Sequence, residues 1–145
     1  MDLMVPAGAP IGKKGGLGMS EIRALIVDDS SVMRKIVERA LRQAGLDALV
    51  VHEAGSGAEG LEVLKSKTVD LILSDINMPT MDGLEFLRQI RALNLAADVP
   101  VVMITTESSE EHVKQAIQAG AQGYIRKPFT AEQVKERVLP LVRKA

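Results

Sequence analysis

The chain has 145 residues, of which 46% are hydrophobic, and this is enough for one domain with a full hydrophobic core. Its 18 Lys and Arg residues are balanced by 19 Asp and Glu residues, so the net charge of -1 provides no basic surface for binding nucleic acid. The absence of cysteine excludes disulfides and cysteine metal sites, and no apolar run reaches the roughly 20 residues of a membrane span. With no secretion signal either, we expect a cytoplasmic protein that contacts neither nucleic acid nor membrane.

Residues 1–19 differ in composition from the rest of the chain. They are rich in Gly and Pro and show no apolar periodicity, so they cannot bury enough apolar surface to fold unaided. We therefore expect a flexible N-terminal extension over residues 1–19 and a single folded domain over residues 20–145.

Short apolar, β-branched runs alternate with longer segments of helical periodicity from residue 20 onward. The third and fourth runs are apolar nearly throughout, which is typical of parallel strands that are covered on both faces. The predicted strands are residues 22–27, 49–52, 69–73, 99–104 and 123–126.

The segments between and after these strands carry apolar stripes at helical spacing. Three of the helices have the residue spacing of an N-terminal capping box, in which a Ser or Thr is followed three residues later by Glu or Gln. These pairs are Ser56 with Glu59, Ser108 with Glu111, and Thr130 with Gln133. The pattern of the last helix is expected to end near residues 139–140, because a proline there removes a backbone donor.

Five successive strand-helix units predict an α/β fold: an open, five-stranded parallel sheet with right-handed crossovers and helices on both faces. Polar side chains stand at or just after the ends of four predicted strands. Because the carboxyl ends of parallel strands meet at one edge of the sheet, these side chains should converge there. They are Asp28, Asp29, Asp75, Thr105 and Lys127.

Three carboxylates at one site favour a bound cation. Two carboxylates about 5 Å apart repel each other by roughly 3 kcal/mol at an effective dielectric constant of 20. Oxygen ligands without His or Cys favour a hard ion, and Mg2+ commonly combines one or two carboxylates with water and a phosphate oxygen. The sequence therefore predicts a site for Mg2+ and a phosphoryl group.

Each of these residues has a simpler interpretation when it is taken alone. The acids after the first strand could cap the next helix, and Asp75 could be a turn residue before Pro79. Thr105 could be an ordinary strand residue, and a single lysine such as Lys127 is usually a surface residue. These interpretations do not explain why all of the polar positions fall at the same end of the strand-helix units.

Four segments together resemble the receiver domains of two-component response regulators, in particular the single-domain chemotaxis regulators of the CheY type. The resemblance covers residues 20–145 and implies a doubly wound, flavodoxin-like sheet with strand order 2-1-3-4-5. The four segments, Val-Asp-Asp-Ser, Asp-Ile-Asn-Met-Pro with Met-Asp-Gly, Ile-Thr-Thr-Glu and Gly-Tyr-Ile-Arg-Lys-Pro-Phe, occupy residues 27–30, 75–79 with 81–83, 104–107 and 123–129.

The resemblance implies a role for each acid. Asp29 and Asp75 would bind Mg2+ directly with the backbone carbonyl of Asn77, and Asp28 would act mainly through water. Asp75 would be the phosphoacceptor that takes a phosphoryl group from a phosphohistidine of a histidine kinase. Lys127 would help to neutralise the phosphoryl oxygens. The bond between Lys127 and the proline after it is typically cis in this family.

The resemblance also implies a switch. The Thr105 hydroxyl would bind the new phosphoryl group, and Tyr124 would turn inward in response. The surface that contacts a downstream protein would then consist of the fourth helix, fifth strand and fifth helix. The rate of dephosphorylation would depend on Asn77, Thr106 and Glu107. Asn77 and Glu107 can orient a water molecule, and the side chain of Thr106 narrows the path of that water to the phosphorylated aspartate.

We therefore expect a phospho-accepting signalling protein rather than an enzyme, with chemotaxis as its setting. A phosphorelay intermediate, which passes phosphate on to a second histidine protein, is an alternative. A phosphatase with an aspartate nucleophile would need a general acid two residues later, where Asn77 stands. An inert flavodoxin-like binding module would not need the acidic cluster.

Overall fold

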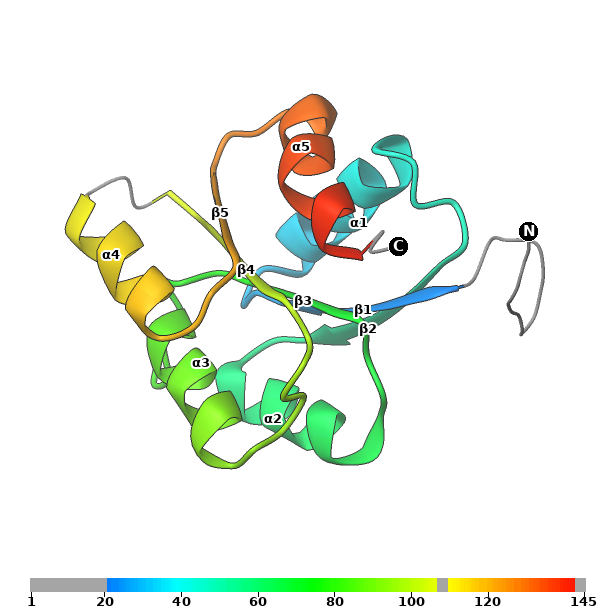
Figure 1. The fold of residues 1–145 in the computed structure, drawn as a ribbon. Helices are drawn as coiled ribbons and strands as arrows, with labels where there is room; N and C mark the ends of the chain where they lie inside the picture. Colours follow the sequence, from blue (N-terminus) through cyan, green and yellow to red (C-terminus); the bar gives the residue numbers. More distant parts are fainter. Residues whose placement is uncertain (1–20, 107–109, 143–145) are drawn as a thin grey trace.

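The computed structural model describes residues 21–106 and 110–142 (Figure 1). The predicted extension over residues 1–19 lies outside them. Five strands and five helices alternate along the described residues. They are β1 (Ile22–Val27), α1 (Ser31–Gln43), β2 (Leu49–Ala54), α2 (Gly57–Ser66), β3 (Leu71–Ser74), α3 (Gly83–Ala92), β4 (Val101–Thr105), α4 (Glu110–Gln118), β5 (Gly123–Arg126) and α5 (Ala131–Val142).

The sheet is parallel throughout and has the strand order β2-β1-β3-β4-β5, which confirms the predicted fold. Helices α1 and α5 cover one face of this sheet, and α2, α3 and α4 cover the other (Figure 1). From β1 the chain first forms β2 at one edge of the sheet, and it then crosses to β3 and continues through β4 to β5 at the other edge. None of the helices in residues 21–106 and 110–142 is long and apolar enough to cross a bilayer.

A separate hydrophobic core lies on each face of the sheet. Because successive side chains of a strand point to opposite faces, Ala24 and Ile26 of β1 join the core beneath α1 and α5. Leu25 and Val27 join the core beneath α2, α3 and α4. The central strands are thus buried on both sides, as their nearly continuous apolar sequence predicted.

Several predicted boundaries were wrong by one to three residues. Strands β3 and β4 begin two residues later than expected, because Val69 and Val99 pack against the core before the strand ladder begins. Strand β2 continues to Ala54. Helix α5 passes through Pro140 and ends at Val142. This is tolerated because Pro140 lies on the exposed face in the last turn, where water can replace the missing backbone hydrogen bond.

Two of the three predicted capping boxes lie within the described residues. At α5, the backbone N–H of Gln133 donates to the Thr130 hydroxyl and the Gln133 side chain accepts from the Thr130 N–H, so this box is confirmed. At α2, Ser56 caps the helix, but the Glu59 carboxylate accepts from the preceding N–H of Gly55. The remaining pair, Ser108 with Glu111, includes a residue outside the described part of the chain.

Candidate functional site

The structure brings the predicted polar residues together at the carboxyl edge of the sheet. Asp28 and Asp29 follow the last residue of β1, and Asp75 follows the last residue of β3. Thr105 is the last residue of β4, and Lys127 follows β5. Parallel pairing aligns these strand ends, which explains why residues up to 99 positions apart in the sequence meet here.

Three carboxylates form the centre of the site. Asp28, Asp29 and Asp75 each offer an oxygen atom, and these atoms lie within 4.8 Å of one another. Asp28 and Asp75 are buried, whereas Asp29 is exposed. A hard divalent cation could therefore bind from the solvent side, with carboxylate oxygens on one side and water on the other.

Lys127 supplies a positive charge beside two of the three carboxylates. Its Nζ atom lies 3.2 Å from Asp28 Oδ2 and 3.5 Å from Asp75 Oδ2, and its side chain is only 13% exposed. The backbone N–H of Lys127 donates to the Thr105 carbonyl at 2.9 Å, which fixes the start of the loop after β5. The peptide bond between Lys127 and Pro128 is cis, as the family resemblance predicted.

Burial dominates the electrostatics of Asp75. It raises the pKa of this carboxyl above its usual range, and the nearby Asp28 adds to the rise. The ammonium of Lys127 acts in the opposite direction, as does the backbone N–H of Asn77, which donates to Asp75 Oδ1 at 3.3 Å. The Asp75 carboxylate is thus poorly solvated and close to a cation, a suitable state for a nucleophile.

The Asp28 side chain is held from two directions. Its Oδ1 atom accepts from the backbone N–H of Ser30 at 2.9 Å, while its Oδ2 atom faces Lys127. Ser30, not Asp28 or Asp29, caps helix α1 by accepting from the N–H of Met33 at 3.1 Å. The simple capping interpretation of the two acids is therefore wrong, which leaves both carboxylates facing the site.

Of the residues expected to tune the phosphate lifetime, Asn77 contacts both Asp75 and Thr105. The Asn77 side-chain amide donates to the Thr105 hydroxyl at 3.3 Å, and Thr105 itself is fully buried. Asn77 and Thr106 are exposed at the mouth of the site. Glu107, which was expected to act with them, lies outside the described residues.

Gly83 is required by close backbone packing at the end of the loop after β3. Its N–H donates to the Ile76 carbonyl at 2.8 Å, and Asp82 caps helix α3 by accepting from the N–H of Glu85 at 2.8 Å. A Cβ atom at position 83 would collide with the Asp75 carbonyl oxygen and lie 2.7 Å from Met103 Cε. An Asp-Gly pair is typical of a turn, but no sequence pattern indicates that position 83 lies against the backbone of Asp75.

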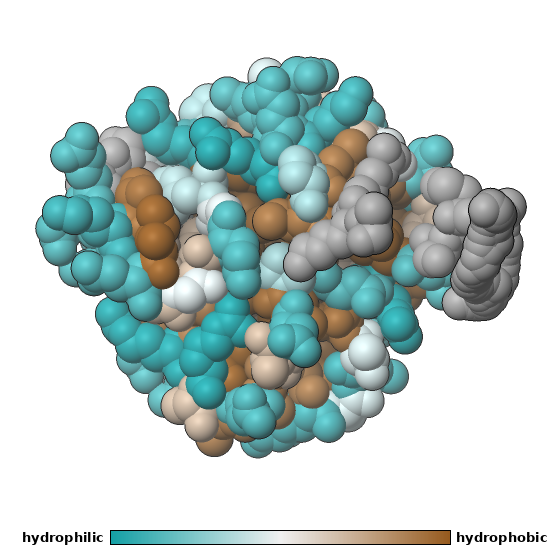
Figure 2. Space-filling model, viewed as in Figure 1, coloured by the Kyte–Doolittle hydropathy of each residue, from teal (hydrophilic) through white to brown (hydrophobic). Residues whose placement is uncertain are grey.

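Tyr124 is half-buried on β5, opposite Met103 of β4. It lines a groove between α4, β5 and α5 together with Val113, Pro128 and Arg137. Helix α4 also exposes Ile117 (61%), and Figure 2 shows a hydrophobic patch over this helix at the left of the view. This face combines apolar and charged side chains, a composition that suits contact with another protein.

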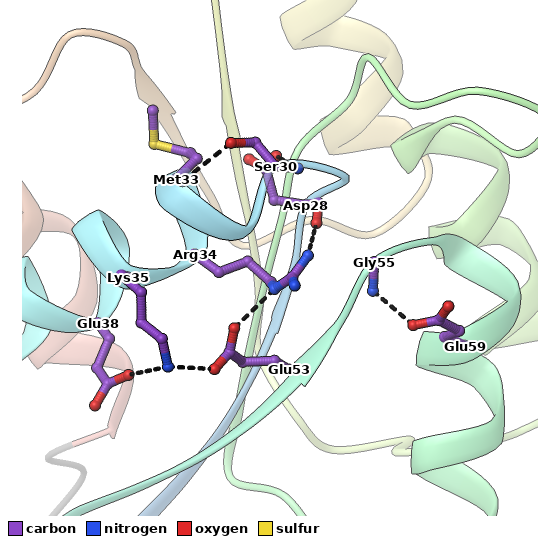
Figure 3. A network of polar contacts seen from close by, with 9 residues as sticks. All are labelled: Asp28, Ser30, Met33, Arg34, Lys35, Glu38, Glu53, Gly55 and Glu59. Carbon is purple, nitrogen blue, oxygen red and sulfur yellow. Dashed lines mark hydrogen bonds and ion pairs between the residues drawn. The ribbon is translucent and has the colours of Figure 1, made fainter.

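Arg34 of α1 belongs to the surroundings of the site, although sequence reasoning missed it. Its guanidinium donates to the backbone carbonyl of Asp28 and to the Glu53 carboxylate of β2 (Figure 3). An arginine on a helix that is rich in basic residues gives no sequence signal for such a contact. Only the packing of α1 across β1 and β2 creates it.

The model for the response regulator receiver domain matches residues 24–139 of this chain. The chain is 44% identical over 117 residues to the chemotaxis protein CheY-3 of Vibrio cholerae, covering 81% of this chain and 88% of that protein. It is 40% identical over 118 residues to a chemotaxis protein CheY homolog of Campylobacter jejuni, covering 81% and 89% of the two chains.

Solved structures with the same fold include further proteins of this kind. The chemotaxis protein CheY4 of Vibrio cholerae matches with a TM-score of 0.75 and 34% identity, over 84% of this chain and 99% of that one. A CheY-like receiver domain protein from Methanospirillum hungatei matches with a TM-score of 0.74 and 29% identity, over 85% and 94% of the two chains.

Proposed function

Because this chain belongs to the response regulator receiver family, we propose that Asp75 accepts a phosphoryl group from a histidine kinase and that the protein thereby controls a protein partner in chemotaxis. The curated relatives with 40–44% identity are chemotaxis proteins, which supports chemotaxis as the setting.

One observation carries the assignment of Asp75. It is the buried carboxylate of the cluster that lies within reach of both the ammonium of Lys127 and, through Asn77, the hydroxyl of Thr105. Asp28 is also buried beside Lys127, but its Oδ1 atom accepts from the N–H of Ser30 and not from Asn77, the residue that contacts Thr105. Asp29 is exposed. The contacts with Lys127 and, through Asn77, with Thr105 support Asp75 as the carboxylate that accepts the phosphoryl group.

The reaction follows from these positions. A carboxylate oxygen of Asp75 attacks the phosphorus of a phosphohistidine, the P–N bond breaks with its electron pair going to the ring nitrogen, and a P–O bond forms. Lys127 remains protonated and stabilises the negative charge on the transferred oxygens. The Thr105 hydroxyl then donates a hydrogen bond to one of these oxygens.

The acidic cluster fits Mg2+, because its ligands are oxygen atoms close enough to share one ion. Asp29 and Asp75 would hold the ion directly with the Asn77 backbone carbonyl, and Asp28 would hold it through water. Bound Mg2+ would neutralise charge on the phosphoryl oxygens. Without it, the buried carboxylates would repel an incoming phosphoryl group.

The output would be a change at the face formed by α4, β5 and α5. Thr105 ends β4, and Tyr124 lies on the adjacent strand β5, paired with Met103 two residues before Thr105. A shift of Thr105 toward a phosphoryl group would therefore open space near Tyr124. The groove around Tyr124 would then change shape, and a protein partner could distinguish the two states.

The test uses phosphoramidate, which contains the P–N bond of a phosphohistidine, and intact-protein mass spectrometry. The unmodified protein should gain one phosphoryl group in the presence of Mg2+ and none after chelation. Asp75→Asn should gain none. Asp29→Ala should also remain unlabelled, whether Mg2+ is present or not.

Asp82→Asn is the matched control, since Asp82 is an acid of the same loop and Asn caps helices equally well. This variant should be labelled like the unmodified protein. A phosphoryl group that is still added to Asp75→Asn would overturn the assignment.

A further inference from the structure

The backbone carbonyl of Asp28 lies beyond the end of the β1 ladder. The N–H of Asp28 still donates to the Ala54 carbonyl of β2 at 3.1 Å, but β1 itself ends at Val27. Asp28 is 4% exposed, so its carbonyl needs a partner within the protein. This carbonyl belongs to the peptide unit that joins Asp28 to Asp29, so its orientation affects the direction in which both carboxylates point.

Arg34 provides this partner from the first turn of α1. One terminal nitrogen of its guanidinium donates to the Asp28 carbonyl at 2.5 Å, and its Nε atom donates to Glu53 Oε1 at 2.7 Å. Figure 3 shows the side chain extended between the end of β1 and the carboxylate on β2. The Arg34 side chain is 17% exposed, so the contact is well shielded from water.

We infer that Arg34, held in place by Glu53, is a positioning residue for the cation site: it fixes the strand end that carries the Asp28 and Asp29 carboxylates. The inference rests on the proposed function, because it assigns Arg34 to the binding of the divalent cation there. Removing a group that does not bind the metal itself but orients the residues that do typically weakens metal affinity by 10- to 100-fold.

The simpler interpretation is an ion pair that ties α1 to β2. Lys35 already makes that connection, since its ammonium lies 2.7 Å from Glu53 Oε2. Lys35 is 65% exposed, and its other ion-pair contact is with Glu38 of the same helix at 3.9 Å. Arg34 makes an additional contact with the backbone carbonyl of Asp28, a residue of the cation site. An ion pair that ties α1 to β2 does not require this contact.

This geometry requires arginine rather than lysine. A guanidinium is planar and presents donors in a fixed fork, so it can reach a carboxylate and a carbonyl at once. The single ammonium of a lysine at position 34 retains the charge but cannot occupy both places. Arg34→Lys therefore separates the loss of positioning from the loss of charge.

The experiment measures Mn2+ binding by electron paramagnetic resonance, in which free Mn2+ gives the signal. Arg34→Lys should raise the dissociation constant for Mn2+ about tenfold or more. Lys35→Met, which removes the neighbouring ion pair to the same carboxylate, should remain within about twofold of the unmodified protein. Thermal unfolding of all variants shows whether each is folded during the titration.

Nuclear magnetic resonance adds a second measurement, the hydrogen exchange of a single amide, which should not change if Arg34 only ties α1 to β2. Hydrogen exchange at the Ser30 amide, which donates to Asp28 Oδ1, should become faster in metal-free Arg34→Lys and stay unchanged in Lys35→Met. If Arg34→Lys does not fold, Glu53→Gln replaces it and is compared with Lys35→Met. The difference between these two variants isolates the part of the network that acts through Arg34.

Arg34→Lys that is folded and binds Mn2+ as tightly as the unmodified protein would overturn the inference, and so would equal losses in Arg34→Lys and Lys35→Met. In both cases the proposed function stands if the unmodified protein binds Mn2+ and is labelled. An unmodified protein that binds no Mn2+ would instead overturn the cation site, and the role of Arg34 with it.

Discussion

The side-chain amide of Asn77 donates a hydrogen bond to the hydroxyl of Thr105 across 3.3 Å, and it thereby connects the loop after β3 to the end of β4. The backbone N–H of the same Asn77 donates to Asp75 Oδ1 at 3.3 Å. Asn77 thus lies beside both Asp75, the proposed phosphoacceptor, and the hydroxyl that would bind the product.

This position predicts an effect of Asn77 on phosphate lifetime. Asn77 is exposed and can orient a water molecule in line with the bond to Asp75. Asn77→Ala should therefore lengthen the lifetime of the phosphorylated protein by roughly tenfold. Intact-protein mass spectrometry after removal of the phosphodonor measures the decay, and a decay as fast as in the unmodified protein would contradict this role.

Thr106 should act in the opposite direction. Its β-branched side chain is stiff and exposed next to Thr105, where it would narrow the approach of water to Asp75. Thr106→Ala should shorten the phosphate lifetime in the same decay experiment. Thr68→Ala is the control, because Thr68 is an exposed threonine that precedes β3 at the other end of the strand. A decay in Thr106→Ala as slow as in the control would refute the steric argument.

The fold and the convergence of the site could be predicted because both follow from repetition. Five strand-helix units impose a parallel sheet. In a parallel sheet the strand ends that carry Asp28, Asp75 and Lys127 lie at one edge, independent of the conformation of the connecting loops. Strand ends were less predictable, since apolar residues such as Val69 pack against the core without joining the ladder.

The contacts that hold the site could not be predicted from the sequence. The Arg34 contact depends on how α1 crosses β1 and β2, and the contact of Gly83 with Asp75 depends on the path of the loop after β3. Both involve backbone atoms, which carry no residue-specific pattern. Composition and periodicity report which face of an element is buried, not which carbonyl a side chain reaches.

Lys127 should connect phosphorylation to the change at Tyr124. Lys127→Ala removes the ammonium beside Asp75 but none of the three carboxylates, so the variant should still be labelled, although more slowly. Because the chain contains one tyrosine and no tryptophan, emission at tyrosine wavelengths reports on Tyr124 alone. Phosphorylation should change this emission in the unmodified protein and leave it unchanged in Lys127→Ala. Constant emission in the unmodified protein would show that Tyr124 does not respond.

Gly83→Ala should destabilise the fold by about 1 to 3 kcal/mol, the usual range for overpacking. The new Cβ atom would collide with the Asp75 carbonyl, so the loop must shift away from Asp75. Urea unfolding should show a lower midpoint with an unchanged slope, and labelling of Asp75 should slow. Gly55→Ala is the control, because its Cβ atom would be no closer than 3.5 Å to its neighbours. Equal stability of the two variants would contradict the packing argument.

Glu53 should make the stability of the protein sensitive to acid. Hydrogen bonds from Lys35 and Arg34 lower the pKa of this carboxyl below its ordinary value of 4.5, against the opposing effect of burial. The folded state therefore binds fewer protons than the unfolded state between the two pKa values. The stability that Glu53 contributes is fully present above the unfolded pKa and is lost as the pH falls through the lower, folded pKa.

Glu53→Gln tests this relation, since glutamine retains the shape of the side chain without its charge. Urea unfolding at a series of pH values from about 7 down to about 3 should show the variant to be less stable near neutrality, with the difference shrinking as the pH falls. Glu62→Gln is the matched control: Glu62 pairs with Lys65 at 3.0 Å but is 73% exposed, so solvent screens the pair and its removal should change little at any pH. A difference between Glu53→Gln and the unmodified protein that stays constant across this range would contradict the prediction, because it would exclude ionisation of the Glu53 carboxylate as its source.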